Sequence, residues 1–324
     1  MNGMFKNRNV VILIIFGFFV HALILKAVFD IYFSSPIDNG MTPIKSTNNP
    51  PAKRLVFIVA DGLRADGIFG KSQSEAPNLT KIRKTRGSWG VAHTRVPTES
   101  RPGHIALLGG IYEDPAAILK GWKVNPVDFD SVINQSTNAW CWGGPSIVNM
   151  FNRDNLPHIH LYSYDPSMED YGKNDTISLD QWVFDQVENF IEQHKICNDC
   201  KHFRQSGNLF FLHLLGIDTA GHAYKPESAE YKSNIKFVDE HIPKIEELFE
   251  NVFPDKSTAY VFSADHGMTN WGSHGAGSYH ETETPLIAWG AGIKINQKRM
   301  DIDQIDVAPL LSALIGINFP INSL

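Results

Sequence analysis

The chain has 324 residues, of which 43% are hydrophobic and 20% are charged, so it has enough apolar material for a sizeable globular core. Its formal net charge is −6 and neither sign forms a long block, which argues against a nucleic-acid-binding protein. The length allows one large domain or two small ones.

The N-terminal segment predicts a membrane anchor. Residues 10–29 form an apolar run in which Lys26 is the only residue with a formal charge. Twenty helical residues span roughly 30 Å, the thickness of a bilayer core. A cleaved signal peptide is the alternative, but its apolar core is usually shorter and ends at small residues. Because Lys6 and Arg8 precede the run, we expect residues 1–9 in the cytosol and the rest of the chain across the membrane.

The region after the anchor is typical of a tether in the secretory pathway. Residues 30–53 contain four prolines among Ser, Thr, Asn and Gly, which predicts a non-helical lumenal linker before a domain at 54–324. N-glycosylation sequons at Asn78, Asn134 and Asn174 fit the same compartment.

The cysteines indicate a local disulfide. Cys197 and Cys200 form a CxxC pair, and no second pair completes a four-ligand zinc site, while Cys141 stands alone. We expect a disulfide between Cys197 and Cys200 in an oxidising compartment, with two free thiols as the alternative.

Four continuous apolar runs predict strands that are buried on both faces. They are residues 55–60, 209–217, 259–264 and 285–290.

Helical patterns lie between these runs. Ser178 has the spacing of a capping box before one helix, Pro243 should kink a second helix, and Gly316 should end a third. Strands that alternate with helices predict an α/β sandwich with a mostly parallel central sheet and helices on both faces.

Three of the predicted strands deliver an aspartate near their carboxyl end: Asp61, Asp218 and Asp265. In open α/β sheets this edge is where ligands bind. One such aspartate alone would more often be a helix N-cap. Three of them, two with a histidine close by, favour a binding site.

Histidines accompany these aspartates at spacings that suit metal ligands. His222 follows Asp218 by four residues, His266 follows Asp265 directly, and His274 lies between two glycines. Carboxylates and imidazoles without a thiolate suit Zn²⁺ or Mn²⁺. Six ligands are too many for one tetrahedral zinc, so we predict two divalent metal ions, with Zn²⁺ preferred.

A two-metal site needs an attacking group. The segment PTESRPGH, residues 97–104, offers the hydroxyls of Thr98 and Ser100. Serine and threonine before a helix are usually caps, so the segment alone proves little.

The segments VADGLRAD, RVPTESRPGHIALLGG, GIDTAGHAYKP, SADHGM and GSHG, in this order, resemble the motifs of the alkaline phosphatase superfamily. PTESRPGH and KGWK (residues 120–123) resemble more narrowly the transferases that add phosphoethanolamine to the glycosylphosphatidylinositol (GPI) anchor precursor. The resemblance covers nearly the whole chain and implies an alkaline-phosphatase-like fold.

The resemblance implies two groups of metal ligands. The first is Asp61, Thr98, Asp265 and His266, and the second is Asp218, His222 and His274. Thr98 is the implied nucleophile, at the position where sulfatases have a modified cysteine and alkaline phosphatases a serine. A metal ion can lower the pKa of an oxygen bound to it by several units, which would make a threonine hydroxyl reactive.

The implied reaction transfers phosphoethanolamine from phosphatidylethanolamine to a mannose of the GPI precursor through a covalent intermediate on threonine. The implied location is the endoplasmic reticulum membrane, with a single span and a lumenal catalytic domain. The full-length family continues into many membrane spans, so we expect this chain to represent the catalytic domain with its first anchor. The alternatives are a metal-dependent phosphodiesterase on the same site and a non-catalytic membrane-tethered form.

Further side chains are candidates for substrate contacts. Glu99, Arg101 and His104 would orient the phosphate or the ammonium group, with capping and loop packing as equal alternatives. Trp142, Trp271 and Tyr279 would line a glycan path, unless they are ordinary core or surface aromatics. No role is assigned to His280 or Glu281.

Overall fold

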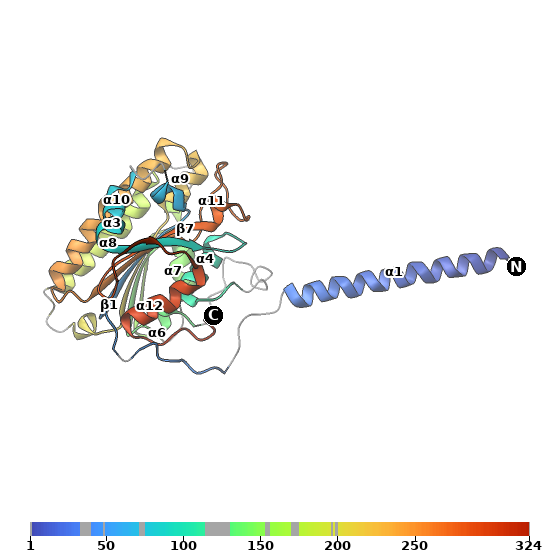
Figure 1. The fold of residues 1–324 in the computed structure, drawn as a ribbon, viewed down its shortest axis with the longest axis horizontal. Helices are drawn as coiled ribbons and strands as arrows, with labels where there is room; N and C mark the ends of the chain where they lie inside the picture. The colour runs from blue at the N-terminus through green and yellow to red at the C-terminus, as the bar shows by residue number, and fades with distance from the viewer. Residues whose placement is uncertain are drawn as a thin grey trace.

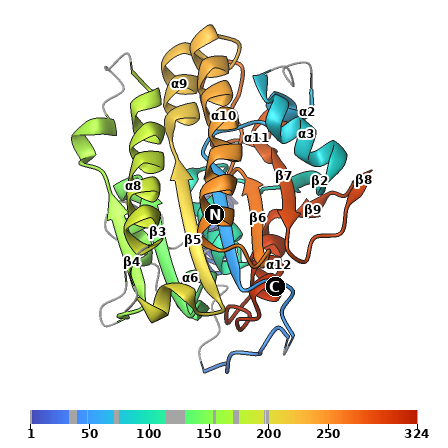
Figure 2. The same ribbon diagram turned by 90° about the vertical axis from the view of Figure 1, so that its left-hand side faces the viewer.

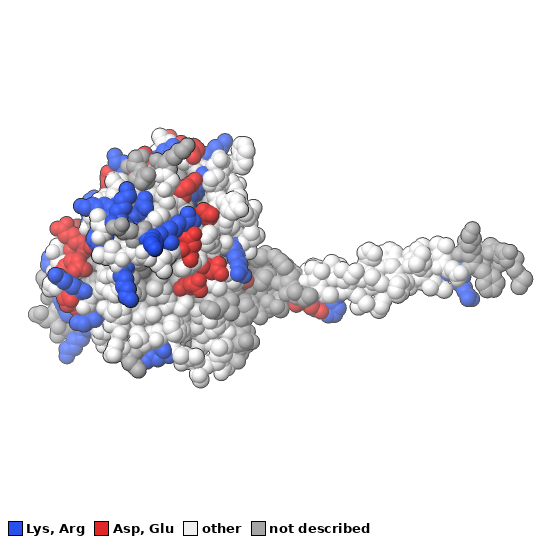
Figure 3. All heavy atoms as spheres, in the orientation of Figure 1, with Lys and Arg blue, Asp and Glu red and all other residues white. Residues whose placement is uncertain are grey.

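The computed structural model describes residues 2–32, 40–47, 49–70, 75–113, 130–152, 156–169, 175–195, 197 and 200–323. Helix α1 (Asn2–Tyr32) extends away from the rest of the fold (Figure 1). Its segment Arg8–Asp30 has a mean hydropathy of 2.6 and no buried residues, and by length and composition it is the one helix of the described part that could cross a membrane. The charged groups visible on this helix lie toward its two ends (Figure 3).

A nine-stranded sheet forms the centre of the domain, in the order β4-β3-β5-β1-β6-β7-β2-β8, with β9 paired to β2 (Figure 2). Its strands are β1 (Arg54–Ala60), β2 (Gly87–His93), β3 (Asn138–Gly143), β4 (Ile159–Ser163), β5 (Asn208–Leu214), β6 (Thr258–Ser263), β7 (Glu283–Gly290), β8 (Asn296–Arg299) and β9 (Ile302–Asp303). Only β7 runs antiparallel to its two neighbours, β6 and β2. The predicted mostly parallel sheet is therefore confirmed.

Helices cover both faces of this sheet, as predicted. They are α2 (Ala65–Phe69), α3 (Pro77–Thr85), α4 (Ser100–Gly109), α6 (Val132–Gln135), α7 (Pro145–Val148), α8 (Ile177–Lys195), α9 (Gly216–Tyr224), α10 (Ala229–Val252), α11 (Tyr279–Thr282) and α12 (Val307–Ile315), with 3₁₀ turns at Asn149–Phe151, Pro166–Glu169, Lys201–Arg204 and Gln304–Asp306. Figure 2 shows α8 and α10 on one face and α6 and α12 on the other.

Strand β1 explains the two cores. Its seven residues are all buried, and their side chains alternate between the faces because a strand has a period of two. Leu55 and Phe57 pack with α4 and α12, whereas Val56 and Ile58 pack with α8 and α10. A continuous apolar run is therefore what a strand covered on both faces requires.

The four predicted strands correspond to β1, β5, β6 and β7. β5 ends at Leu214, earlier than predicted, because Gly216 already begins α9. The other strands were missed because they are short or carry glycine and polar residues, as in β2 (GSWGVAH).

One of the three predicted helix details differs from expectation. The capping box at Ser178 is wrong, because α8 already begins at Ile177 and the Ser178 N–H donates to Asp175 Oδ1 at 3.1 Å. α10 continues on both sides of Pro243, and the kink at this position stays a prediction. The end of α12 is confirmed, since Gly316 takes the left-handed φ of +71° that favours glycine.

The disulfide between Cys197 and Cys200 is confirmed, and Cys141 is a buried free thiol. Glycosylation stays a prediction. At Asn78 the side-chain amide already donates to Asp239 Oδ2 at 3.0 Å, so a glycan would replace that bond. Asn134 lies in α6, while Asn174 and residues 120–123 lie outside the described residues.

Candidate metal centre

The sheet topology brings three carboxylates to one edge. Strands β5, β1 and β6 are adjacent and parallel, so their carboxyl ends meet. Asp61 follows β1, Asp265 follows β6, and Asp218 lies in the first turn of α9, directly after β5. This is the edge at which ligands bind in open α/β sheets.

The first ligand group consists of Asp61, Asp265 and His266, and all three side chains are fully buried. His266 Nε2 lies 3.4 Å from Asp61 Oδ1 and 3.5 Å from Asp265 Oδ2. The other ring nitrogen, Nδ1, lies 2.8 Å from the Gly267 carbonyl oxygen, which can only accept a hydrogen bond. Nδ1 therefore carries the proton in the neutral ring, and the Nε2 lone pair faces the carboxylates.

The second group consists of Asp218, His222 and His274. His222 Nδ1 donates to the Gly272 carbonyl oxygen at 2.9 Å, and His274 Nδ1 donates to the Thr98 carbonyl oxygen at 2.8 Å. The two Nε2 atoms face each other at 3.0 Å, with Asp218 Oδ2 3.4 Å from His222 Nε2. Backbone carbonyls that fix the far nitrogen of an imidazole are typical of metal-ligating histidines.

The two groups adjoin. The rings of His266 and His274 are stacked with centroids 4.0 Å apart. Gly62 separates Asp218 from the first group, and a Cβ at this position would lie 2.7 Å from Asp218 Oδ1. Its N–H donates to Asp265 Oδ1 at 3.2 Å. The glycine, with φ of +70°, thus lets the carboxylates of both groups approach one another.

The donor atoms of both groups fit divalent cations. Asp265 Oδ2 in the first group and Asp218 Oδ1 in the second are buried oxygens without a hydrogen-bond partner. Burying such an oxygen costs free energy unless a cation lies next to it. Facing imidazole lone pairs in the second group have the same need. A cation in each group would satisfy these atoms, and oxygen and imidazole donors suit Zn²⁺ or Mn²⁺.

The pKa values reflect this crowding. Burial would raise the pKa of the Asp61 carboxyl, but a hydrogen bond from His213 and the charges of His266 and His213 hold it well below its usual range. Burial and the charge of Asp61 raise the pKa of Asp265 well above its usual range. A hydrogen bond to Asp218 raises the pKa of His222 to about 9 against the opposing effect of burial. The second group therefore attracts positive charge, and a proton and a dication would compete for it.

The described hydrogen bonds of Thr98, the expected nucleophile, connect it to the loop that carries His274. Its buried hydroxyl donates to the Ala276 carbonyl oxygen at 2.7 Å and accepts from the Gly275 N–H at 2.8 Å. Its own carbonyl oxygen receives the bond from His274. Thr98 thus clamps the loop that carries His274, which is a structural task.

Ser100 lies beside the first ligand group. Its Oγ lies 3.3 Å from Asp61 Oδ1 and 3.3 Å from His266 Nε2. Ser100 is the first residue of α4, after Glu99 in extended conformation, so its hydroxyl lies at a helix N-terminus. Such a terminus offers backbone N–H groups and a partial positive charge to an anion.

The three candidates for substrate contacts have different surroundings in the structure. His104 is fully buried, with its Nδ1 2.7 Å from the Ser100 carbonyl oxygen and 3.5 Å from Asp265 Oδ2, and burial together with His213 lowers its pKa to about 3. Glu99 approaches His274 Nδ1 at 3.3 Å. Arg101 pairs with Glu113 through a contact of 2.8 Å.

His213 belongs to the site and was missed. It lies on β5, fully buried, and its Nδ1 accepts from the Gly144 N–H at 3.1 Å. Its Nε2 therefore carries the proton and donates to Asp61 Oδ2 at 3.1 Å. The signal was a single histidine within an apolar strand run, which by itself is also typical of a core residue.

Glu281 was given no role, yet it is 1% exposed and accepts from the Ala276 N–H at 2.8 Å. It fixes the far side of the loop that carries His274. Of the three aromatic candidates, Trp142 is buried on β3 and borders a separate cleft of about 270 Å³ that contains no member of either ligand group, whereas Trp271 and Tyr279 are exposed. At the surface, His280 Nδ1 lies 3.6 Å from Asp66 Oδ2.

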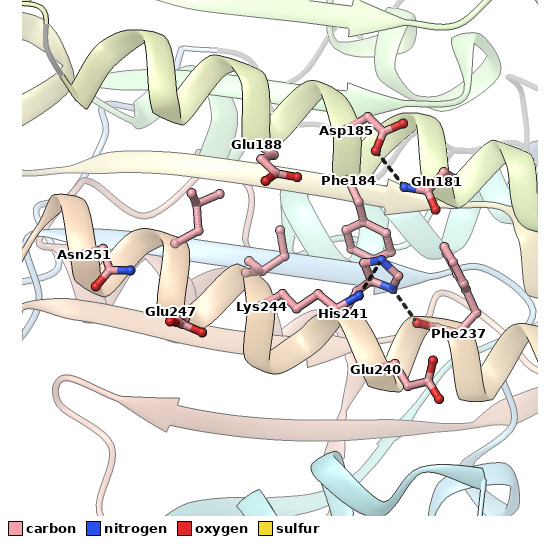
Figure 4. A pocket seen from close by; sticks show the side chains of 12 residues that line it. Gln181, Phe184, Asp185, Glu188, Phe237, Glu240, His241, Lys244, Glu247 and Asn251 are labelled. Atoms are coloured by element: carbon pink, nitrogen blue, oxygen red, sulfur yellow. Dashed lines mark hydrogen bonds between the residues drawn. The ribbon is translucent and has the colours of Figure 1, made fainter.

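One groove of the described part lies elsewhere. It measures about 670 Å³ between α8 and α10, and Figure 4 shows Phe184, Phe237 and His241 within it and carboxylates such as Glu188 around it. None of the residues that line it belongs to either ligand group. Chemistry, rather than cavity size, therefore identifies the site.

Comparison with known proteins agrees with the fold. A family model described as type I phosphodiesterase/nucleotide pyrophosphatase matches residues 55–308. GPI ethanolamine phosphate transferase 1 from Mus musculus and from Homo sapiens are each 48% identical to this chain over an alignment of 335 positions. The alignment covers 95% of this chain and 36% of each relative. The Saccharomyces cerevisiae protein of the same name is 43% identical over 98% of this chain and 38% of its own. The chain thus spans little more than a third of the length of these curated relatives.

Solved structures share the fold. Wild-type alkaline phosphatase PafA has a TM-score of 0.65 at 12% identity, covering 86% of this chain and 98% of its own. A protein of the alkaline phosphatase superfamily from Vibrio parahaemolyticus has a TM-score of 0.60 at 14% identity, covering 90% and 75%. Both confirm the predicted alkaline-phosphatase-like architecture. Fold and family model agree, and the chain therefore belongs to the type I phosphodiesterase/nucleotide pyrophosphatase family.

Proposed function

We propose that this chain carries the catalytic site of a metal-dependent ethanolamine phosphate transferase that modifies the GPI anchor precursor. The observation that carries the proposal is the position of the Ser100 hydroxyl, within 3.3 Å of both Asp61 and His266 and beside two groups of metal-ligating side chains. The names of the curated relatives supply the reaction, and the donor, the acceptor and the lumenal side of the endoplasmic reticulum membrane remain part of the proposal.

Two divalent ions would be held by the chain. Asp61, Asp265 and His266 would hold one ion, and Asp218, His222 and His274 the other. Bound dications would lower the pKa of a nearby hydroxyl and neutralise charge on the attacking and leaving oxygens. We expect Zn²⁺, with Mn²⁺ as the alternative.

Ser100 replaces Thr98 as the proposed nucleophile. Its Oγ would attack the phosphorus of phosphatidylethanolamine, forming a Ser O–P bond as the bond from phosphorus to the diacylglycerol oxygen breaks. The proton that Ser100 loses ends on the diacylglycerol oxygen. The phosphoryl group would lie at the N-terminus of α4, where the helix favours negative charge.

A mannose hydroxyl of the GPI precursor would then attack the same phosphorus from the opposite side. The new mannose O–P bond forms as the Ser O–P bond breaks, and the mannose proton returns to Ser100. His213 would hold Asp61 in place through both steps, because its proton is fixed at Nε2 by Gly144.

The test is covalent labelling with phosphatidylethanolamine that carries a radiolabelled headgroup. Wild type and Thr98→Ser should retain label on the protein, and peptide mapping should place it on Ser100. Ser100→Ala should retain its metal and its folded state but take up no label. Label on Thr98, or undiminished turnover by Ser100→Ala, would refute the assignment.

A phosphodiesterase is the second candidate, favoured by the name of the matching family model. It would use the same Ser100 intermediate and pass the phosphoryl group to water. Labelled phosphoethanolamine released into solution, with no label on an added GPI precursor, would select the hydrolase over the transferase. The third alternative, a non-catalytic form, has weaker support because neither ligand group lacks a member.

A further inference from the structure

The loop that carries His274 has an unusual composition for a surface. Residues 269–280 contain no Lys, Arg, Asp or Glu, although 20% of the whole chain is charged. None of these residues is buried, and eight of the twelve are exposed. An exposed loop of this length would ordinarily carry about two charged residues.

Large apolar side chains flank this loop. Trp271 is 80% exposed and Tyr279 is 81% exposed, and among the described residues outside α1 they are the two most exposed large hydrophobic side chains. Val96, 61% exposed, lies beside the same loop, since a Cβ on Gly277 would come within 3.1 Å of its Cγ2. Val96, Trp271 and Tyr279 together are called the rim surface below.

The rim surface borders the metal centre directly. Trp271 precedes Gly272, whose carbonyl oxygen accepts the hydrogen bond from His222. Tyr279 is the first residue of α11, two positions before Glu281, which holds the Ala276 N–H. Whatever contacts the rim surface therefore touches the loop that positions His222 and His274.

Physical chemistry selects the partner of such a surface. Tryptophan and tyrosine are enriched where a membrane meets water, because each ring has an apolar body and a polar tip. Permanently charged groups resist entry into an apolar phase, and this loop carries no Lys, Arg, Asp or Glu. Isolated exposed apolar residues are common, whereas exposed apolar residues that gather on one loop indicate a contact surface.

A bilayer is within reach of the rim surface. Helix α1 could span a membrane, and 21 residues separate its end at Tyr32 from the start of β1 at Arg54. At a maximum of about 3.5 Å per residue, such a connection keeps the domain within roughly 75 Å of the bilayer. Contact with lipid thus needs no additional recruiting partner.

We propose that the rim surface docks into the interfacial zone of the bilayer that holds α1, so that the metal centre opens onto lipid headgroups. The purpose of this contact rests on the proposed function, because both proposed substrates are lipids. The contact itself is independent of turnover and can be tested without it.

The experiment uses the full chain reconstituted in phosphatidylcholine vesicles whose acyl chains are brominated near the headgroup. Bromine quenches tryptophan fluorescence only at close range. Helix α1 contains no tryptophan, so quenching reports on the domain alone. Subtracting the emission of Trp271→Phe from that of wild type isolates Trp271, because all other tryptophans are common to both proteins. Trp182→Phe, which removes a partly buried tryptophan of α8, is the matched control.

The proposal predicts that brominated lipid removes most of the Trp271 emission, that aqueous iodide has little effect on it, and that the Trp182 emission is unchanged by either. Quenching of Trp271 by iodide but not by brominated lipid would overturn the proposal, because the loop would then face water. Protection of Trp271 from both quenchers would also overturn it, because protein rather than lipid would cover the loop. Loss of labelling in Ser100→Ala has no bearing on this readout, so failure of the contact and failure of the chemistry are distinguishable.

Discussion

The Nε2 atoms of His222 and His274 face each other at 3.0 Å, while the Nδ1 atom of each ring donates to a backbone carbonyl oxygen. Two neutral imidazoles arranged in this way present lone pairs to each other, with Asp218 alongside. Only a proton or a metal cation between them makes the arrangement favourable. The second ligand group is therefore arranged around a positive charge.

Gly62→Ala should remove the metal from the second group. A methyl group at this position would lie 2.7 Å from Asp218 Oδ1, and the left-handed φ of +70° adds about 1–2 kcal/mol of backbone strain. Gly40→Ala is the matched control, since Gly40 has a φ of +87° but nothing within 4 Å of its Cβ position. Metal analysis of both variants should show a loss only in Gly62→Ala, and equal metal content in the two would contradict the predicted clash.

Thr98→Val should weaken metal binding without abolishing covalent chemistry. The substitution keeps the side-chain shape but leaves the Gly275 N–H and the Ala276 carbonyl oxygen without their Thr98 partner, at a cost of about 1–3 kcal/mol. At saturating metal the variant should still acquire label on Ser100, and its apparent metal affinity should be lower than that of Thr98→Ser. Complete loss of labelling in Thr98→Val under these conditions would return the nucleophile role to Thr98.

His213→Leu should lower the metal affinity of the first group by about 10–100-fold, as is usual when a residue that orients a ligand is lost. The variant removes the donor to Asp61 Oδ2 and leaves the Gly144 N–H unpaired. His213→Gln, which restores a donor amide, should recover part of the affinity. Chelator competition measures the apparent dissociation constants, and identical values for wild type and His213→Leu would show that His213 only fills the core.

Asp180→Asn should stabilise the domain at neutral pH. Asp180 is fully buried, and burial raises its pKa to about 7 despite hydrogen bonds from the Gly216 and Leu215 N–H groups. Its Oδ2 and Asn234 Oδ1 both lack a hydrogen-bond partner, and both lie within 2.8 Å of the position of a Cβ on Gly216. An asparagine amide could donate where the carboxylate cannot.

The sign of the pH dependence follows from linkage. The folded pKa of Asp180 lies above the unfolded value of about 3.9, so its contribution to stability is fully present at low pH and is lost as the pH rises through about 7. The advantage of Asp180→Asn should therefore grow between about pH 4 and pH 7, by about 4 kcal/mol for a pKa difference of about three, and then level off. Thermal unfolding across this range measures it, and an advantage that is constant with pH would contradict the raised pKa.

The strand-end carboxylates could be predicted from sequence because their signal is local. An apolar run that ends in Asp61 or Asp265 indicates both a buried parallel strand and a polar residue at the ligand-binding edge. Periodicity does not predict that β5, β1 and β6 are neighbours in the sheet. The division of the metal ligands into two groups rested on the resemblance to the alkaline phosphatase superfamily. The structure supplies the pairing that brings the three aspartates together.

The proposed nucleophile and the residues around it could not be predicted from local sequence patterns. Thr98 and Ser100 are two residues apart, and only the start of α4 at Ser100 decides which hydroxyl meets Asp61. His213 lies inside an apolar run, where a histidine is also consistent with simple core packing. Its role depends on Gly144, 69 residues away, whose N–H fixes the tautomer.

The central claim is that the chain holds a pair of divalent cations beside Ser100. Metal content per folded chain, measured by plasma mass spectrometry after reconstitution with Zn²⁺ or Mn²⁺, tests it most directly. The account predicts two ions in wild type and in Ser100→Ala, one ion in His222→Ala, and two in His241→Ala, whose histidine lies in the α8–α10 groove away from both ligand groups. Absence of bound metal in wild type, or equal content in wild type and His222→Ala, would contradict it.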